Sequence, residues 1–161
     1  MSVVVRRADA NDLDQLAQLF DDYRQFYKQA SNVAAAREFL AERLAANEST
    51  VLIAEHDSAV IGFTQLYPLF SSVRMGRTWL LNDLFVAPNA RRLGAARALL
   101  DAACMFARDH GALGLELETG IDNDNAQALY RRAGWQLGEN LHFHYDFVDH
   151  PTQQHAGSDH P

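Results

Sequence analysis

The sequence predicts a mixed α/β domain in which helices pack against a central sheet. Two observations indicate this: apolar residues recur at a two-residue or a helical spacing along the chain, and turn-forming residues separate these segments. The resulting order is β-α-α-β-β-β-α-β-α-β, without an internal repeat. A chain of 161 residues with 48% apolar residues suffices for one domain with a core. We assign residues 1–150 to this domain and expect residues 151–161, which are polar, to be disordered.

The first third of the chain predicts one strand followed by two helices. Val3–Arg7 is rich in β-branched residues, which favour a strand. Asp12 and its polar neighbours can cap a helix whose apolar residues recur at helical spacing as far as Tyr27. Ser31 and Asn32 break this helix, and a second apolar series at helical spacing follows them.

A β-hairpin is predicted in the middle of the chain. Val51–His56 and Ala59–Tyr67 are strand-like and are separated by the two-residue turn Asp57-Ser58. We expect Pro68 to end the second strand, because proline cannot donate to a sheet ladder. Leu69–Arg77 is then expected to be a polar loop.

The next strand, Thr78–Val86, carries apolar residues on both faces and is predicted to be buried in the sheet. Asn82 and Asp83 interrupt this apolar pattern. Because polar groups in a buried strand need partners, these side chains are either satisfied locally or placed for use.

The last third predicts two helices and two strands. Ala95–Asp109 has the apolar stripe of a helix packed on a sheet, and Leu113–Thr119 alternates like a strand. A short helix follows, capped by Asp122 or Asn123. Leu141–Val148 alternates sufficiently to form a closing strand.

Charge and cysteine content restrict the functional classes. Lys and Arg number 14 and Asp and Glu 21, so the net charge is 14 − 21 = −7. This balance disfavours nucleic-acid binding and suits a cationic partner. No apolar run is long enough to span a membrane, and the first residues do not resemble a secretory signal. A single cysteine, Cys104, cannot form an internal disulfide, so we expect a cytoplasmic protein.

The stretch from the buried strand into the following helix predicts an anion site. After the break at Pro88 come Arg91, Arg92 and Arg97, with small residues at Gly94 to Ala96. Backbone N–H groups at a helix start lack intrahelical partners, and together with the helix dipole they attract phosphate. The alternative is an ordinary β-α turn with a solvated basic edge.

Two motifs resemble a known family. Arg91-x-x-Gly94-x-Ala96 resembles the Gln/Arg-x-x-Gly-x-Gly/Ala pyrophosphate motif of the GNAT superfamily, the acyl-coenzyme-A-dependent N-acyltransferases. The segment 123–135 resembles the N-x-x-A-x-x-L-Y-x-x-x-G-F/W segment of the same family. The resemblance extends from Val3 to Val148. It implies a mostly antiparallel central sheet whose fourth and fifth strands splay apart, with acetyl-CoA bound in the gap.

The resemblance also assigns residues to the cofactor. The end of the fourth strand would face the pantetheine arm, the following loop would hold the pyrophosphate, and the last helix would form the other wall. These cofactor-binding residues would be Leu84, Phe85, Val86, Arg91, Arg92, Leu93, Gly94, Ala95, Ala96, Arg97, Asn123 and Ala126.

Acetyl transfer to an amine requires a group that removes a proton and another that protonates the leaving sulfur. A phenol with a pKa near 10 is protonated at pH 7, so Tyr130 fits the general acid, as the resemblance also implies. Several diamine N-acetyltransferases of the superfamily carry Glu-Asp where this chain has Asn82 and Asp83. Asp83 is the candidate base or ammonium-binding group. Glu116 and Glu118 are alternatives for the base, although they could instead form a solvated or edge face. Tyr27 and Asn82 are candidate acceptor contacts, although Tyr27 and Tyr130 could instead be packing residues.

The leading hypothesis is an enzyme that acetylates a primary amine of a small cationic acceptor. The alternatives are a protein or peptide N-acetyltransferase and a non-catalytic acyl-CoA-binding module. The resemblance suggests a homodimer. The exposed-looking pair His142 and His144 has no nearby set of Cys, Asp or Glu, so we expect no metal site.

Overall fold

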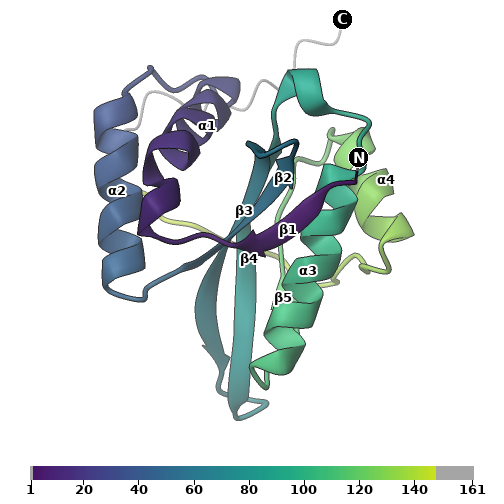
Figure 1. Ribbon diagram of the computed structural model, residues 1–161. Coiled ribbons are helices and arrows are strands. Elements are labelled where there is room, and N and C mark those ends of the chain that lie inside the picture. The colour runs from purple at the N-terminus through teal and green to yellow at the C-terminus, as the bar shows by residue number, and fades with distance from the viewer. Residues whose placement is uncertain (1, 148–161) are drawn as a thin grey trace, which may run out of the picture.

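The computed structural model describes residues 2–147, which form a five-stranded sheet with helices on both faces (Figure 1). Neighbouring strands follow chain order, and all pairs are antiparallel except the parallel pair β4 and β5. The predicted mixed α/β fold is confirmed. The elements are β1 (Val4–Arg7), a 3-10 turn (Ala10–Asp12), α1 (Leu13–Phe26), α2 (Val33–Ala45), β2 (Thr50–His56), β3 (Ala59–Ser71), β4 (Gly76–Val86), a 3-10 turn (Pro88–Ala90), α3 (Ala95–Asp109), β5 (Leu115–Glu116) and α4 (Asp124–Arg132).

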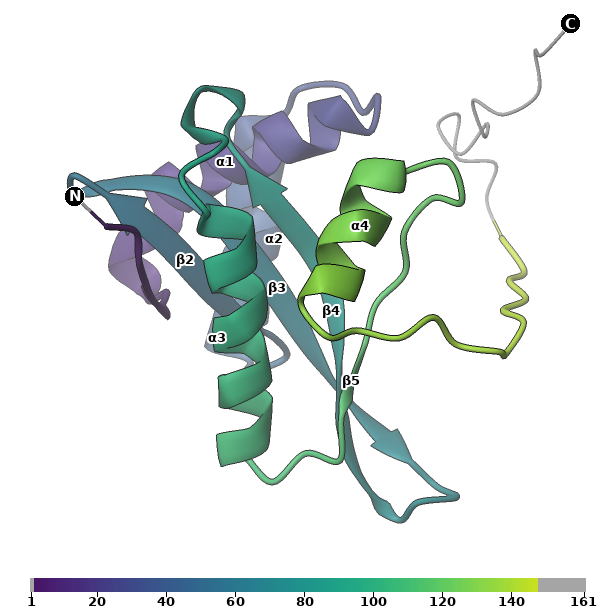
Figure 2. The same cartoon turned by 90° about the vertical axis from the view of Figure 1, so that its right-hand side faces the viewer.

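The sheet separates two apolar cores (Figure 2). Helices α1 and α2 cover one face, where Leu16, Leu40 and Phe63 belong to one buried cluster. Helix α3 covers the other face, where Leu66 and Leu99 belong to a second cluster. We call these the α1–α2 face and the α3 face. Among residues 2–147, no helix combines the length and the apolar character needed to cross a membrane.

A buried carboxylate joins α1 to the segment before α2. The side chain of Asp21 is 0% exposed. Its Oδ1 accepts a hydrogen bond from the Asn32 N–H at 2.7 Å, and its Oδ2 accepts from Ser31 Oγ at 2.7 Å and Gln25 Nε2 at 2.9 Å. Arg24 Nη1 lies 3.7 Å from Oδ1. The residues predicted to break the first helix therefore fold back onto it.

An extra residue in β4 changes which face its side chains occupy. Gln65 in β3 pairs with Asp83, and the next residue, Leu66, pairs with Leu81, so Asn82 is the bulged residue. Successive strand residues point to opposite faces, and one inserted residue reverses the alternation beyond it.

The two cores confirm this reversal. Before the bulge, Leu81 packs in the cluster on the α3 face, whereas Phe85 beyond it packs in the cluster on the α1–α2 face. Asp83 has the same parity as Phe85 and therefore shares the α1–α2 face with Gln65. The interruption in the sequence pattern thus marks a bulge that delivers a carboxylate to one particular face.

The prediction of a polar loop over Leu69–Arg77 is wrong. Strand β3 continues through Pro68 to Ser71, and β4 begins at Gly76. Pro68 lies opposite Trp79 in the ladder. Proline removes one donor but keeps its carbonyl, and the pairs on either side of it hold the two strands together.

The C-terminal strands also differ from the prediction. Within Leu113–Thr119, only Leu115–Glu116 pairs with the sheet. Residues 141–147 of the predicted closing strand form no strand, and Val148 and the tail 151–161 lie outside the described residues. An alternating pattern forms a strand only where a sheet edge and an apolar surface accept it, because β-propensity depends on context. The apolar side chains of this segment are between 83% and 93% exposed: Leu141, Phe143, Tyr145 and Phe147.

Candidate active site

The loop before α3 presents backbone amides to solvent. Gly94 is the N-cap of α3 in the left-handed conformation, with φ of 81°, and no side chain caps the helix. The Ala98 N–H donates to Gly94 O at 3.0 Å, so the N–H groups from Ala95 to Arg97 precede the first helical bond. A methyl group added to Gly94 would meet nothing within 4 Å. The left-handed backbone, rather than crowding, is what calls for glycine here.

The three arginines of this loop have different surroundings. Arg91 and Arg92 are exposed, and within residues 2–147 neither forms an ion pair. Arg97 Nε contacts the Asp101 carboxylate at 3.0 Å, and its Nη1 donates to Arg132 O at 3.2 Å. The Arg97 guanidinium therefore links α3 to the end of α4.

One edge of β4 loses its strand neighbour. Parallel pairing with β5 is limited to Trp79 with Leu115 and Leu80 with Glu116, whereas β4 continues to Val86. Beyond Leu80 the two segments separate (Figure 2), and in the described part of the chain no strand pairs with that edge. Backbone groups on such an edge are available to a ligand that presents amides.

The predicted cofactor residues border this gap in different ways. Leu84 and Val86 are half-buried and pack at the α3 core, whereas the Phe85 ring is buried in the α1–α2 core. Asn123 is the N-cap of α4, and its side-chain oxygen accepts from the Ala126 N–H at 3.2 Å. The Asn-x-x-Ala pattern therefore has a local role as a helix cap. Of the two predicted caps, Asp122 and Asn123, the structure has Asn123.

Asp83 is the centre of a buried hydrogen-bond network. Its side chain accepts from Gln65 Nε2 at 2.9 Å on Oδ2 and from Asn82 Nδ2 at 3.1 Å on Oδ1. The neighbouring Tyr23 hydroxyl also favours the ionised form of this carboxylate and so lowers its pKa. Ser49 Oγ donates to Gln65 Oε1 at 2.9 Å, which extends the network. Asp83 is 7% exposed, and burial raises its pKa even though these hydrogen bonds act in the opposite direction.

Three tyrosines interact electrostatically with this carboxylate. Tyr23 and Tyr27 come from the end of α1 with ring centroids 5.1 Å apart, and Tyr67 comes from β3. Tyr130 of α4 packs against the α3 core and interacts electrostatically with Tyr27. Tyr27 is therefore the residue that links Asp83 to Tyr130.

Burial is the main cause of the raised pKa of each tyrosine. Burial and the Asp83 charge raise the pKa of Tyr67 to about 12, and they raise those of Tyr23 and Tyr27 as well. Burial and the neighbouring Tyr27 raise the pKa of Tyr130. All four phenols therefore remain protonated at neutral pH, so each can donate a hydrogen bond or a proton.

Sequence reasoning missed Ser49 and Gln65. Gln65 interrupts an apolar run between Phe63 and Leu66, just as Asp83 interrupts β4, and this was the available signal. That Gln65 lies opposite Asp83 follows from the register of β3 against β4, and the sequence of neither strand reveals this register.

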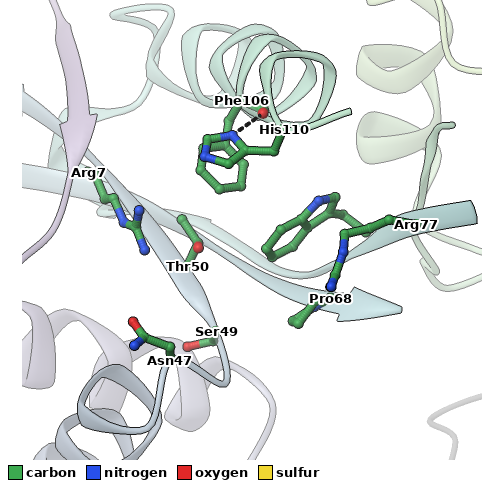
Figure 3. A pocket seen from close by; sticks show the side chains of 9 residues that line it. Arg7, Asn47, Ser49, Thr50, Pro68, Arg77, Phe106 and His110 are labelled. Carbon is green, nitrogen blue, oxygen red and sulfur yellow. Dashed lines mark hydrogen bonds between the residues drawn. The ribbon is translucent and has the colours of Figure 1, made fainter. Parts of the chain in front are cut away.

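A separate hollow of about 310 Å³ lies near the C-terminus of α3 (Figure 3). It contains none of the predicted site residues, and it is lined by Arg7, Asn47, Ser49, Thr50, Pro68, Arg77, Trp79, Phe106 and His110. His110 Nδ1 is 2.7 Å from Phe106 O, so the ring is fixed to its own helix. Ser49 belongs both to this wall and to the Asp83 network.

Comparison with known proteins identifies the family to which the chain belongs. The sequence matches the acetyltransferase (GNAT) family over residues 14–135. It is 48% identical over 132 residues to an uncharacterized N-acetyltransferase, YhfO, of Bacillus subtilis (strain 168), covering 82% of this chain and 89% of that protein. The crystal structure of a probable acetyltransferase matches with a TM-score of 0.86 and 38% identity, over 93% of this chain and 100% of the other.

A more distant structure shares the fold. It is an aminoglycoside N-acetyltransferase in complex with CoA, with a TM-score of 0.75 and 20% identity, covering 91% of this chain and 95% of that one. Together with the family match, the splayed edge of β4 and the open loop before α3 lead to one conclusion. The chain is an acetyltransferase of the GNAT family.

Proposed function

We propose that this enzyme transfers an acetyl group from acetyl-CoA to a primary amine of a small cationic acceptor. The observation that supports this most directly is that Asp83, a buried carboxylate, and Tyr130, a protonated phenol, both interact electrostatically with Tyr27. A buried carboxylate attracts an ammonium group, and a protonated phenol can serve a leaving thiolate. Asn82 and Tyr27 are exposed beside this pair and are the proposed acceptor contacts.

The proposed cofactor site is the loop before α3 and the free edge of β4. The residues there fit a diphosphate, because nothing lies within 4 Å of the position a Gly94 side chain would take, the first-turn amides are uncapped, and Arg91 and Arg92 form no ion pair with residues 2–147. Arg97, Leu93 and the small residues Gly94 to Ala96 would contribute backbone N–H groups. Leu84 to Val86 would offer backbone groups to the pantetheine arm, with Asn123 and Ala126 on the opposite wall. Bound acetyl-CoA supplies the thioester carbonyl and the leaving thiolate.

Asp83 acts as the general base in this proposal. An alkylammonium with a pKa near 10.4 must lose a proton before its nitrogen can attack. Burial lowers the pKa of an ammonium and raises that of a carboxylate, so the two values approach one another when the acceptor enters the site. Asp83 takes the proton, and the released nitrogen forms the new C–N bond.

Tyr130 acts as the general acid. While the C–S bond breaks, the Tyr130 hydroxyl would give its proton to the sulfur. The second proton lost by the acceptor nitrogen would restore the Tyr130 phenol, and the proton on Asp83 would return to solvent. Its raised pKa keeps the phenol protonated until that step. A backbone N–H of the free β4 edge would polarise the carbonyl in the manner of an oxyanion hole.

A thiol-release assay with acetyl-CoA and a panel of polyamines, amino acids, aminoglycosides and peptides tests the function. We expect turnover with small cationic amines, and loss of turnover with retained cofactor affinity in Tyr130→Phe. Activity on peptides alone would identify a protein acetyltransferase. Cofactor binding without turnover on any acceptor would identify a non-catalytic acyl-CoA-binding module. The homodimer and the cytoplasmic location remain predictions, and light scattering of the purified chain tests the first.

A further inference from the structure

We propose that Gln65 is a positioning residue that holds Oδ2 of Asp83, so that Oδ1 is the oxygen that receives the acceptor's proton. Ser49 in turn fixes the orientation of Gln65. This inference rests on the proposed function of Asp83 as a base, and it goes further by assigning the proton to one oxygen and by naming the residues that make this assignment.

The burial of Gln65 makes its hydrogen bonds obligatory. Its side chain is 0% exposed, so neither end of the amide can turn to water. A buried polar group without a partner costs about 1–3 kcal/mol, which strongly favours the arrangement with both ends paired. Here Nε2 donates to Asp83 Oδ2 and Oε1 accepts from Ser49, each at 2.9 Å.

The ionised form of Asp83 fixes the direction of the Gln65 amide. A carboxylate only accepts hydrogen bonds, so the NH₂ end of Gln65 must face it. The opposite end then presents its carbonyl oxygen to Ser49, whose hydroxyl donates to it. Ser49 is itself 3% exposed and is therefore held in place.

The two oxygens of Asp83 consequently have unequal partners. Oδ2 accepts from the fully buried Gln65, whereas Oδ1 accepts from Asn82 at 3.1 Å, and Asn82 is exposed. The neutral phenols of Tyr23, Tyr27 and Tyr67 also face the carboxylate, and Tyr23 favours its ionised form. An exposed amide can rotate towards solvent or substrate and release Oδ1. The proton therefore passes from the acceptor nitrogen to Oδ1, while Gln65 keeps Oδ2 occupied.

The backbone supports the same alignment. Gln65 and Asp83 are directly paired across the ladder next to the bulge, and Thr64 Oγ1 donates to Asp83 O at 2.8 Å. Gln65 is neutral, and within residues 2–147 no arginine or lysine forms an ion pair with Asp83. Gln65 thus orients the carboxylate without the strong pKa depression that a cation would cause.

The test compares Gln65→Leu and Ser49→Ala with the unchanged full-length protein. Because the Gln65 hydrogen bond lowers the pKa of Asp83, its removal raises that pKa, and the acidic limb of the kcat/KM profile moves to higher pH. We expect a shift in the same direction, but smaller, in Ser49→Ala. At neutral pH kcat should fall at least about tenfold in Gln65→Leu, with unchanged acetyl-CoA affinity. Thr50→Val is the matched control, since Thr50 is buried beside Ser49 and makes no side-chain contact with this network.

Two readouts separate this inference from the proposed function. Carbon-13 NMR of labelled aspartate follows the protonation of Asp83 without turnover, so it reports the effect of Gln65→Leu even if no acceptor is acetylated. An acidic limb and an Asp83 titration that both stay unchanged, in a folded Gln65→Leu or Ser49→Ala protein, would overturn the inference. Lower stability without either shift would mean that Gln65 only fills the core.

Discussion

Asp21 in α1 and Asp83 in β4 are both buried carboxylates, and each accepts a hydrogen bond from a glutamine amide at 2.9 Å. Asp21 also receives a backbone N–H and a serine hydroxyl at 2.7 Å each, and Arg24 is close by. Burial alone would raise the pKa of Asp21, but these donors outweigh it and hold the pKa below its usual range. Asp83 has weaker donors and a raised pKa.

The difference shows that burial alone does not distinguish a candidate catalytic carboxylate from a structural one. Asp21 is surrounded by groups that satisfy its charge: Gln25 and Arg24 belong to α1, and Ser31 and Asn32 belong to the segment that Asp21 fastens to this helix. Oδ1 of Asp83, by contrast, accepts from the amide of an exposed residue, Asn82. A buried acid with an incomplete set of partners is therefore the better functional candidate.

The largest expected effect is the loss of activity in Asp83→Asn. This change keeps the shape but removes the proposed base, so kcat/KM should fall roughly 100- to 10,000-fold. The free energy of unfolding at pH 7 should stay the same or rise, because a desolvated charge is removed and the new NH₂ group can replace Oδ1, where its neighbour Asn82 is exposed and can turn away. Steady-state kinetics together with urea unfolding measures both. Near-normal turnover in the variant would show that Asp83 is not the base.

Asp21→Asn should have the opposite effects, namely lower stability with unchanged activity. The new NH₂ group would face donors that Asp21 now satisfies, namely the Asn32 N–H, Ser31 and Gln25, and unfolding should require about 3 kcal/mol less free energy. Below its unfolding temperature the variant should retain its kcat. A large fall in kcat in the folded variant would contradict the purely structural role of Asp21.

The pH dependence of stability should have opposite signs for the two groups. The folded pKa of Asp21 is lowered, so its stabilisation is present above the unfolded pKa near 3.9 and is lost as pH falls through the folded pKa. The folded pKa of Asp83 is raised, so this group adds stability as pH falls towards 3.9. The stability of the unchanged protein relative to Asp83→Asn should therefore increase on acidification, by up to about 1.4 kcal/mol per pH unit. Urea titrations at several pH values measure this slope.

The smallest expected effect is that of Gln25→Leu. Gln25 is exposed, so water can replace its hydrogen bond to Asp21, and the free energy of unfolding should fall by at most about 1 kcal/mol. The kcat/KM profile against pH should not move, in contrast to Gln65→Leu. Denaturant unfolding and the same kinetic assay provide the comparison. A shift of the acidic limb of the kcat/KM profile in Gln25→Leu would show that Gln25 and Gln65 do not differ in their effect on activity.

Much of the fold could be predicted because local patterns determine it. The helix α3 begins at Ala95 and ends at Asp109 as expected, and Ser31 and Asn32 do separate α1 from α2. The predictions that failed depend on distant partners. Pro68 could not be known to continue a strand without β4 opposite it, and residues 141–147 have a strand pattern but no strand partner in the described chain.

The candidate site could also be predicted only where local patterns in the sequence mark its residues. Asp83 and Tyr130 were identified from one interrupted pattern and one motif, but the position of Tyr27, which interacts electrostatically with both, depends on how α1 lies against the sheet. Gln65 was missed because its importance lies in the register of β3 against β4.

The bulge at Asn82 has a consequence for how β4 tolerates changes of length. Deletion of this single residue would make Leu81 and Asp83 direct neighbours in a regular ladder. Asp83 would still lie opposite Gln65, and Phe85 opposite Phe63, so every later side chain would keep its face. Such a deletion would therefore remove the Asn82 amide from Asp83 Oδ1 without turning the carboxylate to the other side of the sheet.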